Sequence, residues 1–236
     1  MATERALLYD RLVEQTGELG ASHRWLVQRT PPGSVVLDAG CAGGYLARVL
    51  TETRDCVVDG IEVEPESAAR AASACRRVFL GSLDDEDFLA SLAGSYDRIL
   101  FGDVLEHLRE PERTLRAITG LLTPGGRILA SLPNVAYWHL RWQLLRGRFE
   151  YEDSGLMDRT HLRFYTFETA ADLFLEAGLR ICARSFTTRL PTRVAGRAVR
   201  RWSRRLPNLF AYQSLIEAAP RTAGAAPEPP VAGPFL

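Results

Sequence analysis

Apolar and polar positions follow two different periodicities in the first two thirds of this chain. Short apolar runs rich in β-branched residues are typical of buried strands, and they lie at 35–40, 56–62, 77–81, 96–102 and 127–133. Between them, apolar residues recur every three or four positions, as on one face of a helix, near 44–52, 65–76, 85–93 and 111–122. This alternation predicts an α/β fold in which helices cover both faces of a mostly parallel sheet.

Proline and glycine residues mark the ends of these elements. Pro65 and Pro111 fall in the first turn of two predicted helices, where a missing backbone N–H is tolerated. A predicted N-terminal helix over 4–29 ends at Pro31-Pro32-Gly33. The sequence Pro124-Gly125-Gly126 predicts a stop followed by a turn.

The last third of the chain has a weaker pattern. Residues 136–146 and 167–177 are predicted to be helical, whereas 147–166 has no clear period and is interpreted as a long polar insertion that carries aromatic residues. Two further predicted strands, over 179–188 and 209–218, bring the expected sheet to seven strands.

We therefore expect one domain over residues 1–219 and a disordered tail over 220–236, which is rich in proline, alanine and glycine. Within the domain we expect, in chain order, a helical cap, a cofactor-binding core, an inserted lid on the acceptor side, and C-terminal helices and strands. Their ranges are 1–33, 34–133, 134–166 and 167–219. A single α/β domain can reach this length.

Charge narrows the classes of partner. The formal net charge is zero, yet residues 189–205 hold seven arginines and no acid, so the rest of the chain carries a net charge of −7. Nucleic acid is therefore not the expected partner. A basic helix over 193–205 is first interpreted as a solvated face, and next as a site for an anionic membrane, an acidic partner or a phosphorylated acceptor.

All basic residues are arginine, which excludes any chemistry that needs a lysine, such as a Schiff base or a phosphate-loop lysine. The four cysteines, Cys41, Cys56, Cys75 and Cys182, are widely spaced and predict buried thiols rather than disulfides or a zinc site. The charged N-terminus is unlike a signal peptide, and no apolar run approaches the ~20 residues of a membrane span. We expect a soluble, cytoplasmic protein.

A glycine-rich turn lies between the first predicted strand and the helix that follows it, in the sequence VVLDAGCAGGYL at 35–46. Such a turn offers backbone N–H groups and close approach to a ligand. Glu62 ends the second predicted strand at the roughly 20-residue spacing expected of an acid that holds a ribose. Asp59 is a rival for this contact. The pattern predicts a site for a nucleoside-bearing cofactor.

The chemistry of the turn decides which cofactor is expected. The dinucleotide fingerprint G-x-G-x-x-G is absent, because Ala42 replaces its second glycine. Asp38, just before the turn, would repel a pyrophosphate but would attract an ammonium or a sulfonium. S-adenosylmethionine carries both of these cations and a ribose.

The motifs in the order in which they occur resemble those of class I S-adenosylmethionine-dependent methyltransferases, of the group similar to ubiquinone-biosynthesis O-methyltransferases and natural-product methyltransferases. The family motif D-x-G-x-G-x-G stands here at 38–44, with Ala42 in place of the middle glycine. GIEVEPESA, YDRILFGDVLEHL and LLTPGGRILASLPN match closely. LGSLDD matches loosely, because Ser82-Leu83 stands where the family often has an acid that contacts adenine.

This resemblance covers roughly residues 20–185 and implies a Rossmann-like doubly wound fold. It also implies a site for S-adenosylmethionine. The residues expected there are Asp38, Gly40, Cys41, Ala42, Gly44, Glu62, Val63, Ser82, Leu83 and Gly102.

Histidine is suited to remove a proton from an acceptor near neutral pH. Of the four histidines, His161 in the predicted lid is preferred as the general base, followed by His107 after the fourth strand. Asp103 is a further catalytic candidate. Asp158 or Glu106 could orient the imidazole.

A divalent metal is a second hypothesis for the same residues. Asp103, Glu106 and His107 form D-x-x-E-H, with His161 as a fourth candidate ligand. This resembles the E-x-x-E-H pattern of metal-using small-RNA 2′-O-methyltransferases, and such ligands suit magnesium or manganese. We favour the alternative in which Glu106 and His107 pack or cap the following helix.

The expected reaction is methyl transfer to a small-molecule acceptor, with a hydroxyl oxygen as the favoured target. Tyr137, Trp138, Trp142, Phe149, Tyr151 and the 155–165 loop are expected to form the acceptor pocket or the core of a lid. Two rival hypotheses remain. One is methylation of an RNA ribose or a membrane-associated, lipid-like phenol, and the other is a nucleoside-binding scaffold with a degenerate site.

Overall fold

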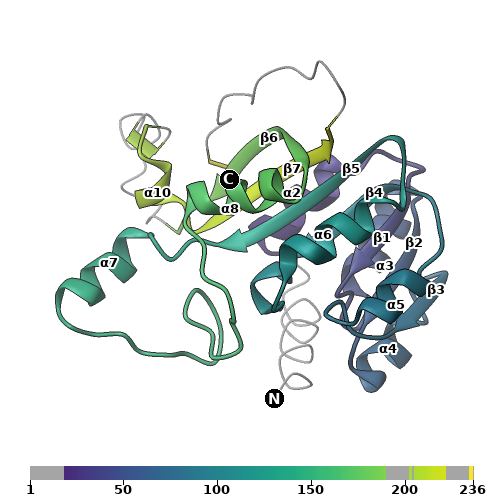
Figure 1. Ribbon diagram of the computed structural model, residues 1–236, viewed down its shortest axis with the longest axis horizontal. Coiled ribbons are helices and arrows are strands. Elements are labelled where there is room, and N and C mark those ends of the chain that lie inside the picture. The colour runs from purple at the N-terminus through teal and green to yellow at the C-terminus, as the bar shows by residue number, and fades with distance from the viewer. Residues whose placement is uncertain (1–18, 190–201, 204, 222–233, 236) are drawn as a thin grey trace. The chain divides into compact units, whose positions relative to one another are not determined.

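Seven strands form one sheet in the computed structural model, which describes residues 19–189, 202–203, 205–221 and 234–235 (Figure 1). In chain order the strands are β1 (Val35–Ala39), β2 (Val57–Glu62), β3 (Arg77–Leu80), β4 (Tyr96–Gly102), β5 (Leu122–Pro133), β6 (Leu179–Thr187) and β7 (Gln213–Pro220). Across the sheet they run β3-β2-β1-β4-β5-β7-β6. β1 is parallel to β2 and β4, β2 is parallel to β3, and β6 and β7 are antiparallel. The predicted α/β class with a seven-stranded sheet is confirmed.

The helices of the described part of the chain alternate with these strands. They are α2 (Ala21–Arg29), α3 (Tyr45–Arg54), α4 (Pro65–Ala71), α5 (Glu86–Ser91), the 3-10 helix η1 (Leu105–His107), α6 (Pro111–Thr119), α7 (Trp138–Leu145), α8 (Phe167–Glu176) and α10 (Pro207–Phe210). Pro65 and Pro111 begin α4 and α6, as predicted from their fixed φ. None of the described helices is long and apolar enough to cross a bilayer.

The chain divides into two compact units. The first contains residues up to 102 together with 113–129, and the second contains 103–112 together with the residues from 130 onwards.

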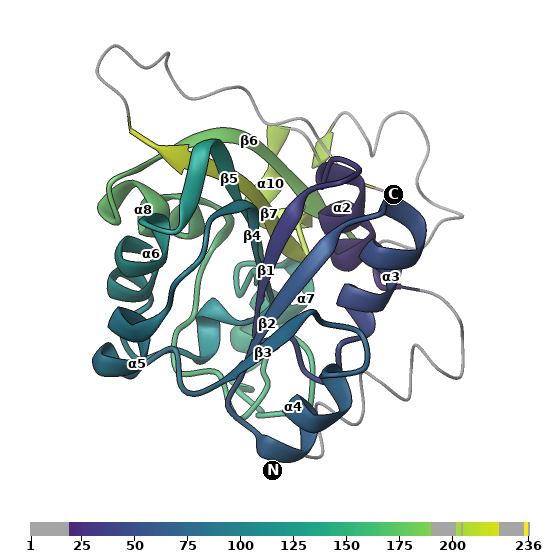
Figure 2. The same cartoon turned by 90° about the vertical axis from the view of Figure 1, so that its right-hand side faces the viewer.

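In the first unit, β1 is almost wholly buried, as expected of a parallel strand covered on both faces. The Asp97 carboxylate ties three strands together, since it accepts hydrogen bonds from the backbone N–H of Val35 (2.9 Å) and the hydroxyl of Thr123 (2.9 Å). α2 and α3 lie side by side against this part of the sheet (Figure 2).

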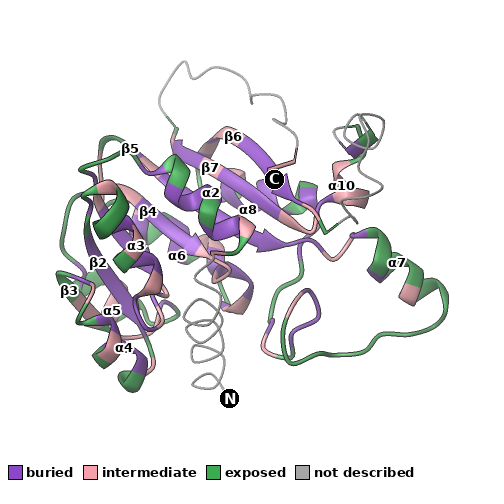
Figure 3. Cartoon of the chain, turned by 180° about the vertical axis from the view of Figure 1, so that it is seen from behind, coloured by how far each residue is buried: buried purple, intermediate pink, exposed green. Residues whose placement is uncertain are grey.

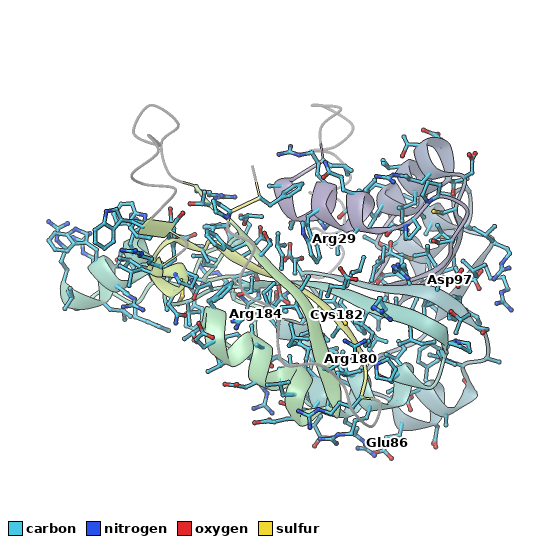
Figure 4. The ribbon with its side chains drawn as sticks, turned by 90° about the horizontal axis from the view of Figure 1, so that it is seen from above. Arg29, Glu86, Asp97, Arg180, Cys182 and Arg184 are labelled. Atoms are coloured by element: carbon cyan, nitrogen blue, oxygen red, sulfur yellow. The ribbon has the colours of Figure 1, made fainter. Side chains whose placement is uncertain are left out.

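In the second unit, α8 packs against the antiparallel pair of β6 and β7. Thr166 and Thr169 form a capping box at its start, and Gly178, with a φ of +84°, follows its end. Arg184, on β6 and labelled in Figure 4, is buried, and its guanidinium donates to the carbonyl oxygen of Phe167 (2.7 Å) and to Glu168 (3.1 Å). These contacts fix the start of α8 on the sheet.

Several predicted boundaries were wrong. β5 begins at Leu122 and runs through Pro124-Gly125-Gly126, which was predicted to be a turn, because Gly125 adopts a φ of +87° that lets the strand bend and continue. The helices predicted over 65–76, 85–93 and 111–122 are shorter, with the bounds given above.

The segment predicted as a strand over 209–218 was also wrong in its first part. Pro207 begins the short helix α10, and the Asn134 amide donates to the carbonyls of Asn208 (3.0 Å) and Ala211 (2.7 Å), which holds that turn. The strand that follows, β7, extends through Pro220, which was assigned to the tail.

At the N-terminus, α2 begins only at Ala21, so the helix predicted over 4–29 does not include residues 19 and 20; residues before 19 lie outside the described part. In the predicted disordered tail, Pro234 forms a bridge with Phe186, and the N–H of Phe235 donates to the Phe186 carbonyl (2.7 Å). Residues 222–233 and most of the arginine-rich segment over 193–205 lie outside the described residues.

Candidate functional site

The glycine-rich turn after β1 adopts a conformation that few residues tolerate. Gly40, Ala42 and Gly44 have φ values of +86°, +48° and +82°. The N–H groups of Gly40 and Cys41 donate to the Ile61 carbonyl at the end of β2 (2.8 and 2.9 Å). A Cβ at Gly44 would lie 2.9 Å from the Cα of Ala71, so only glycine permits α3 and α4 to approach there.

Glu62, at the end of β2, contacts the turn. Its carboxylate is buried and accepts hydrogen bonds from the backbone N–H groups of Ala42, Val63 and Glu64, each at 2.9 Å. A carboxylate offers about four acceptor positions. Glu62 therefore both fixes the turn and retains capacity to accept from a ligand hydroxyl.

Asp38 lies at the end of β1 and is buried, with 3% of its surface exposed. Burial, and then the nearby negative charge of Glu62, raise the pKa of Asp38 to about 7. A buried carboxyl group beside a second negative charge provides a site that a cationic ligand would stabilise.

Asp59, the rival for the ribose contact, is instead committed to the fold. Its fully buried carboxylate accepts from Arg76 (2.7 and 2.8 Å), Arg77 (2.6 and 3.2 Å) and the Tyr96 hydroxyl (2.9 Å). Burial alone would raise the pKa of Asp59, but these donors outweigh it and lower the pKa to about 2. This arrangement favours Glu62 over Asp59 as the residue beside the cofactor.

The remaining predicted cofactor residues differ in exposure. Val63 is 59% exposed, whereas Leu83 is buried and its carbonyl accepts from the Thr114 hydroxyl (2.9 Å). The Ser82 hydroxyl accepts from the N–H of Asp84 (3.2 Å). Gly102 is the last residue of β4, directly beside β1 in the sheet.

A second group of predicted site residues comes together in the second unit. The ligating atoms of Glu106, His107 and His161 all lie within 4.8 Å of one another. Nε2 of His161 is 3.9 Å from Oε1 of Glu106, and the two imidazole rings meet edge to face with centroids 4.8 Å apart. Glu106 and His161 are buried, and His107 is half-buried.

Backbone carbonyls orient both imidazoles of this group. Nδ1 of His107 lies 3.1 Å from the Thr160 carbonyl oxygen, and Nδ1 of His161 lies 3.3 Å from that of Leu156. Since a carbonyl only accepts, these contacts favour a proton on Nδ1 and a lone pair on Nε2 in each neutral ring. Asp158 acts indirectly, because it accepts from the Thr160 hydroxyl (2.6 Å), which lies 3.2 Å from Nδ1 of His107.

Asp103 does not belong to that group. Its carboxylate accepts from both Gln213 (2.8 Å to each oxygen) and the Ser131 hydroxyl (2.8 Å), and its backbone has a φ of +57°. Sequence reasoning missed Ser131, Thr160 and Gln213. No local motif marks them, because each contacts a candidate residue that is distant in the chain, as far as 110 positions for Gln213 and Asp103.

The aromatic segment predicted to form an acceptor pocket divides into two parts. Tyr137 packs in a buried cluster with Leu140, Leu156 and Met157, against Tyr212. The other predicted aromatics are largely exposed, as Figure 3 shows for most of α7: Trp138 39%, Trp142 50%, Phe149 54% and Tyr151 45%. Of the five named aromatics only Tyr137 therefore contributes to a packed interior, together with Leu156 and Met157 of the 155–165 loop.

Comparisons with known proteins match most of this chain to one family. Residues 9–183 match the family described as "Methyltransferase domain". Over 108 residues, the chain is 35% identical to the ubiquinone biosynthesis O-methyltransferase of Xanthomonas axonopodis pv. citri (strain 306). That stretch is 44% of this chain and 45% of the relative, so the chain matches less than half of the length of that protein.

Two solved structures share the fold at low sequence identity. One is a TehB-like SAM-dependent methyltransferase from Corynebacterium glutamicum (TM-score 0.61, 16% identity, 93% of this chain and 98% of that one). The other is the magnesium protoporphyrin IX methyltransferase of Synechocystis PCC 6803 with bound SAH (TM-score 0.56, 19% identity, 84% and 80%). At these identities the likeness concerns the fold alone.

Proposed function

Because this chain belongs to the class I S-adenosylmethionine-dependent methyltransferases, we propose that it methylates a small-molecule acceptor at a hydroxyl oxygen. The match of residues 9–183 to the methyltransferase-domain family supports methyl transfer as the reaction. The similarity to ubiquinone biosynthesis O-methyltransferases over part of the chain supports oxygen as the acceptor atom.

We assign the cofactor to the turn between β1 and α3. Glu62 accepts from the ribose hydroxyls, and Asp38 faces the cationic part of the cofactor. The backbone of Gly40 to Gly44 approaches the ligand closely, because two of its residues are glycines with positive φ. The exposed side chain of Val63 and the 82–83 segment border the adenine.

The proposed reaction is an in-line displacement at the methyl carbon. The bond from methyl carbon to sulfur breaks as the bond to the acceptor oxygen forms, and S-adenosylhomocysteine leaves as a neutral thioether. The acceptor proton passes to Nε2 of His161, whose Nδ1 is held by the Leu156 carbonyl. Glu106, 3.9 Å away, stabilises the resulting imidazolium.

Two measurements test this function. Calorimetry with S-adenosylmethionine should show one site per chain, and a methyl-labelled cofactor should transfer its label to at least one member of a panel of phenols and catechols. Absence of cofactor binding would favour the nucleoside-binding scaffold. Label transfer to RNA or to a lipid-linked phenol, but to no soluble phenol, would favour the rival methyltransferase hypothesis.

The role of His161 has its own test. His161→Ala should lower kcat by a factor of about 10²–10⁴, the usual range for a general base, while the Kd for S-adenosylmethionine stays within twofold. His139→Ala is the matched control, because His139 is exposed on α7 and contacts Gln143. An unchanged kcat in His161→Ala would remove this residue as the base, and His107→Ala would then be the next variant to measure.

One observation favours a divalent metal as a second candidate. The Leu156 carbonyl favours the tautomer of His161 in which Nε2 has a lone pair, and Nε2 lies 3.9 Å from Oε1 of Glu106. Because Nε2 and the carboxylate oxygen are both acceptors, a cation between them, either a proton or a metal, would bind to both. Glu106, His107 and His161 offer one oxygen and two nitrogens, a set that suits magnesium or manganese less well than an all-oxygen set. Retention of full activity after exhaustive chelation would exclude the metal.

A further inference from the structure

A histidine of α2 is buried beside the turn that we assign to the cofactor. His23 has 3% of its surface exposed, and its Nε2 lies 2.8 Å from the hydroxyl oxygen of Tyr45, a hydrogen-bond distance. The two rings meet edge to face with centroids 5.3 Å apart. Tyr45 is the first residue of α3 and directly follows Gly44 of the turn.

The pair lies where the order of the sheet reverses. β2 and β3 lie on one side of β1, and β4 lies on its other side. In such sheets, ligands bind outside the carboxyl ends of the strands at this reversal. A Cβ on Gly102, the last residue of β4, would lie 3.0 Å from Nε2 of His23. The imidazole therefore occupies the space beside the ends of two adjacent strands, and glycine at 102 makes that space available.

A purely structural role does not require these two side chains. Burying an imidazole and a hydroxyl is costly unless they are hydrogen-bonded, and apolar side chains of similar size would fill the same space without that cost. What the pair adds is chemistry, since it presents a phenol oxygen and aromatic faces, which attract cations. The methionine half of S-adenosylmethionine carries an ammonium and a sulfonium.

We propose that Tyr45, held in place by its hydrogen bond to His23, contacts the methionine half of S-adenosylmethionine. Tyr45 is the contacting residue and His23 is its positioning residue. The proposal rests on the proposed function and adds to it two residues of the same unit, one of which comes from the helix that precedes the sheet. In this proposal Glu62 contacts the adenosine half of the cofactor, and neither Tyr45 nor His23 contacts that half.

Binding measurements with whole and partial cofactors test the proposal, because they need no knowledge of the acceptor. We would measure Kd by calorimetry for S-adenosylmethionine, S-adenosylhomocysteine and adenosine on the full chain. Tyr45→Phe and His23→Leu should weaken binding of the first two ligands about tenfold, the effect of one hydrogen bond to a charged group. Adenosine, which lacks the amino-acid half, should bind to these variants within twofold of the wild type.

Two further variants separate binding from folding. His23→Gln keeps a hydrogen-bonding side chain towards Tyr45 and should restore most of the affinity that His23→Leu loses. Tyr96→Phe is the matched control, because it also removes a buried hydroxyl in the same unit, one that donates to Asp59. It should lower the melting temperature and leave all three Kd values within twofold. If His23→Leu does not fold, Tyr45→Phe decides.

Three results would overturn the inference. Unchanged affinities in Tyr45→Phe would show that Tyr45 makes no contact with the ligand. Equal losses for adenosine and S-adenosylmethionine would show that the pair only supports the fold of the turn. If the wild-type Kd values for adenosine and S-adenosylmethionine differ by less than twofold, the methionine half does not contribute to binding. Failure of the wild type to bind any of the three ligands would instead contradict the proposed function.

Discussion

Asp38 joins the stability of the protein to the binding of its proposed ligand. Its pKa of about 7 exceeds the usual value of a carboxyl group because of burial and the charge of Glu62. The native state therefore favours the protonated form. The corresponding contribution to the free energy of unfolding is complete below pH 3.8 and is lost as the pH rises through about 7. A cationic ligand has the opposite preference, because it favours the ionised form.

We predict that the affinity for S-adenosylmethionine rises between pH 6 and pH 8. Below the pKa of Asp38, binding must release a proton, so Kd should fall by up to about tenfold per pH unit there and level off above it. Calorimetry in two buffers of different ionisation enthalpy would count the released proton. Asp38→Asn should bind more weakly and without this pH dependence. A variant that keeps the wild-type pH profile would contradict the assignment.

Ala42 stores strain in the glycine turn. Its φ of +48° is unfavourable for a residue with a Cβ, and the cost is about 1 kcal/mol. Ala42→Gly should raise the free energy of unfolding by about 0.5 kcal/mol, because relief of strain exceeds the extra chain entropy of glycine. Urea unfolding would measure it. The contrasting variant, Gly44→Ala, should destabilise the protein, because its new Cβ would lie 2.9 Å from Ala71.

At the scale of elements, Asp59 links β2 to Arg76 just before β3, to Arg77 at the start of β3, and to Tyr96 at the start of β4. Asp59→Asn would leave two guanidinium groups without their carboxylate. Both arginines are about half exposed, so water can solvate them in the variant. The free energy of unfolding should therefore fall by about 2 kcal/mol, less than for a fully buried ion pair. Chemical unfolding would measure it, and cofactor affinity should change less than stability. If Asp59→Asn instead lost much of its affinity for the cofactor while its free energy of unfolding stayed unchanged, Asp59 would again be a candidate for the ribose contact.

The pH dependence from this residue has the opposite sign to that of Asp38. The pKa of Asp59 is lowered to about 2, so its contribution to the free energy of unfolding is present above pH 3.8 and is lost as the pH falls through about 2. Acid unfolding should therefore be shifted to higher pH in Asp59→Asn, while the wild type resists acid until this carboxylate protonates.

The elements that could be predicted are those whose signal is local. The strands of the first unit are short runs rich in apolar residues, and prolines mark the starts of α4 and α6. The errors arose where a contact outside the segment decides its conformation. Residues 209 and 210 have the composition of a strand, yet they end the helix α10. The Asn134 amide, more than 70 positions away, holds this turn through the carbonyls of Asn208 and Ala211.

At the scale of the whole molecule, the arrangement around the glycine turn was far more predictable than the contacts among the candidate residues of the second unit. The turn, Glu62 and the end of β4 follow from one repeated strand–helix pattern, so their spacing in the sequence places them at one edge of the sheet. The candidate residues of the second unit are held by residues that meet them only after folding, as Gln213 meets Asp103, or lie in the segment over 147–166, which has no period. The sequence named Glu106, His107 and His161, but it could not indicate that Thr160 and Leu156 orient the two imidazoles.

The three backbone N–H groups held by Glu62 have a kinetic consequence. They fix the glycine turn and the residues that follow β2, so neither segment must first fold around an arriving molecule. Association should then proceed in a single phase whose rate rises linearly with ligand concentration and shows no plateau in a stopped-flow experiment.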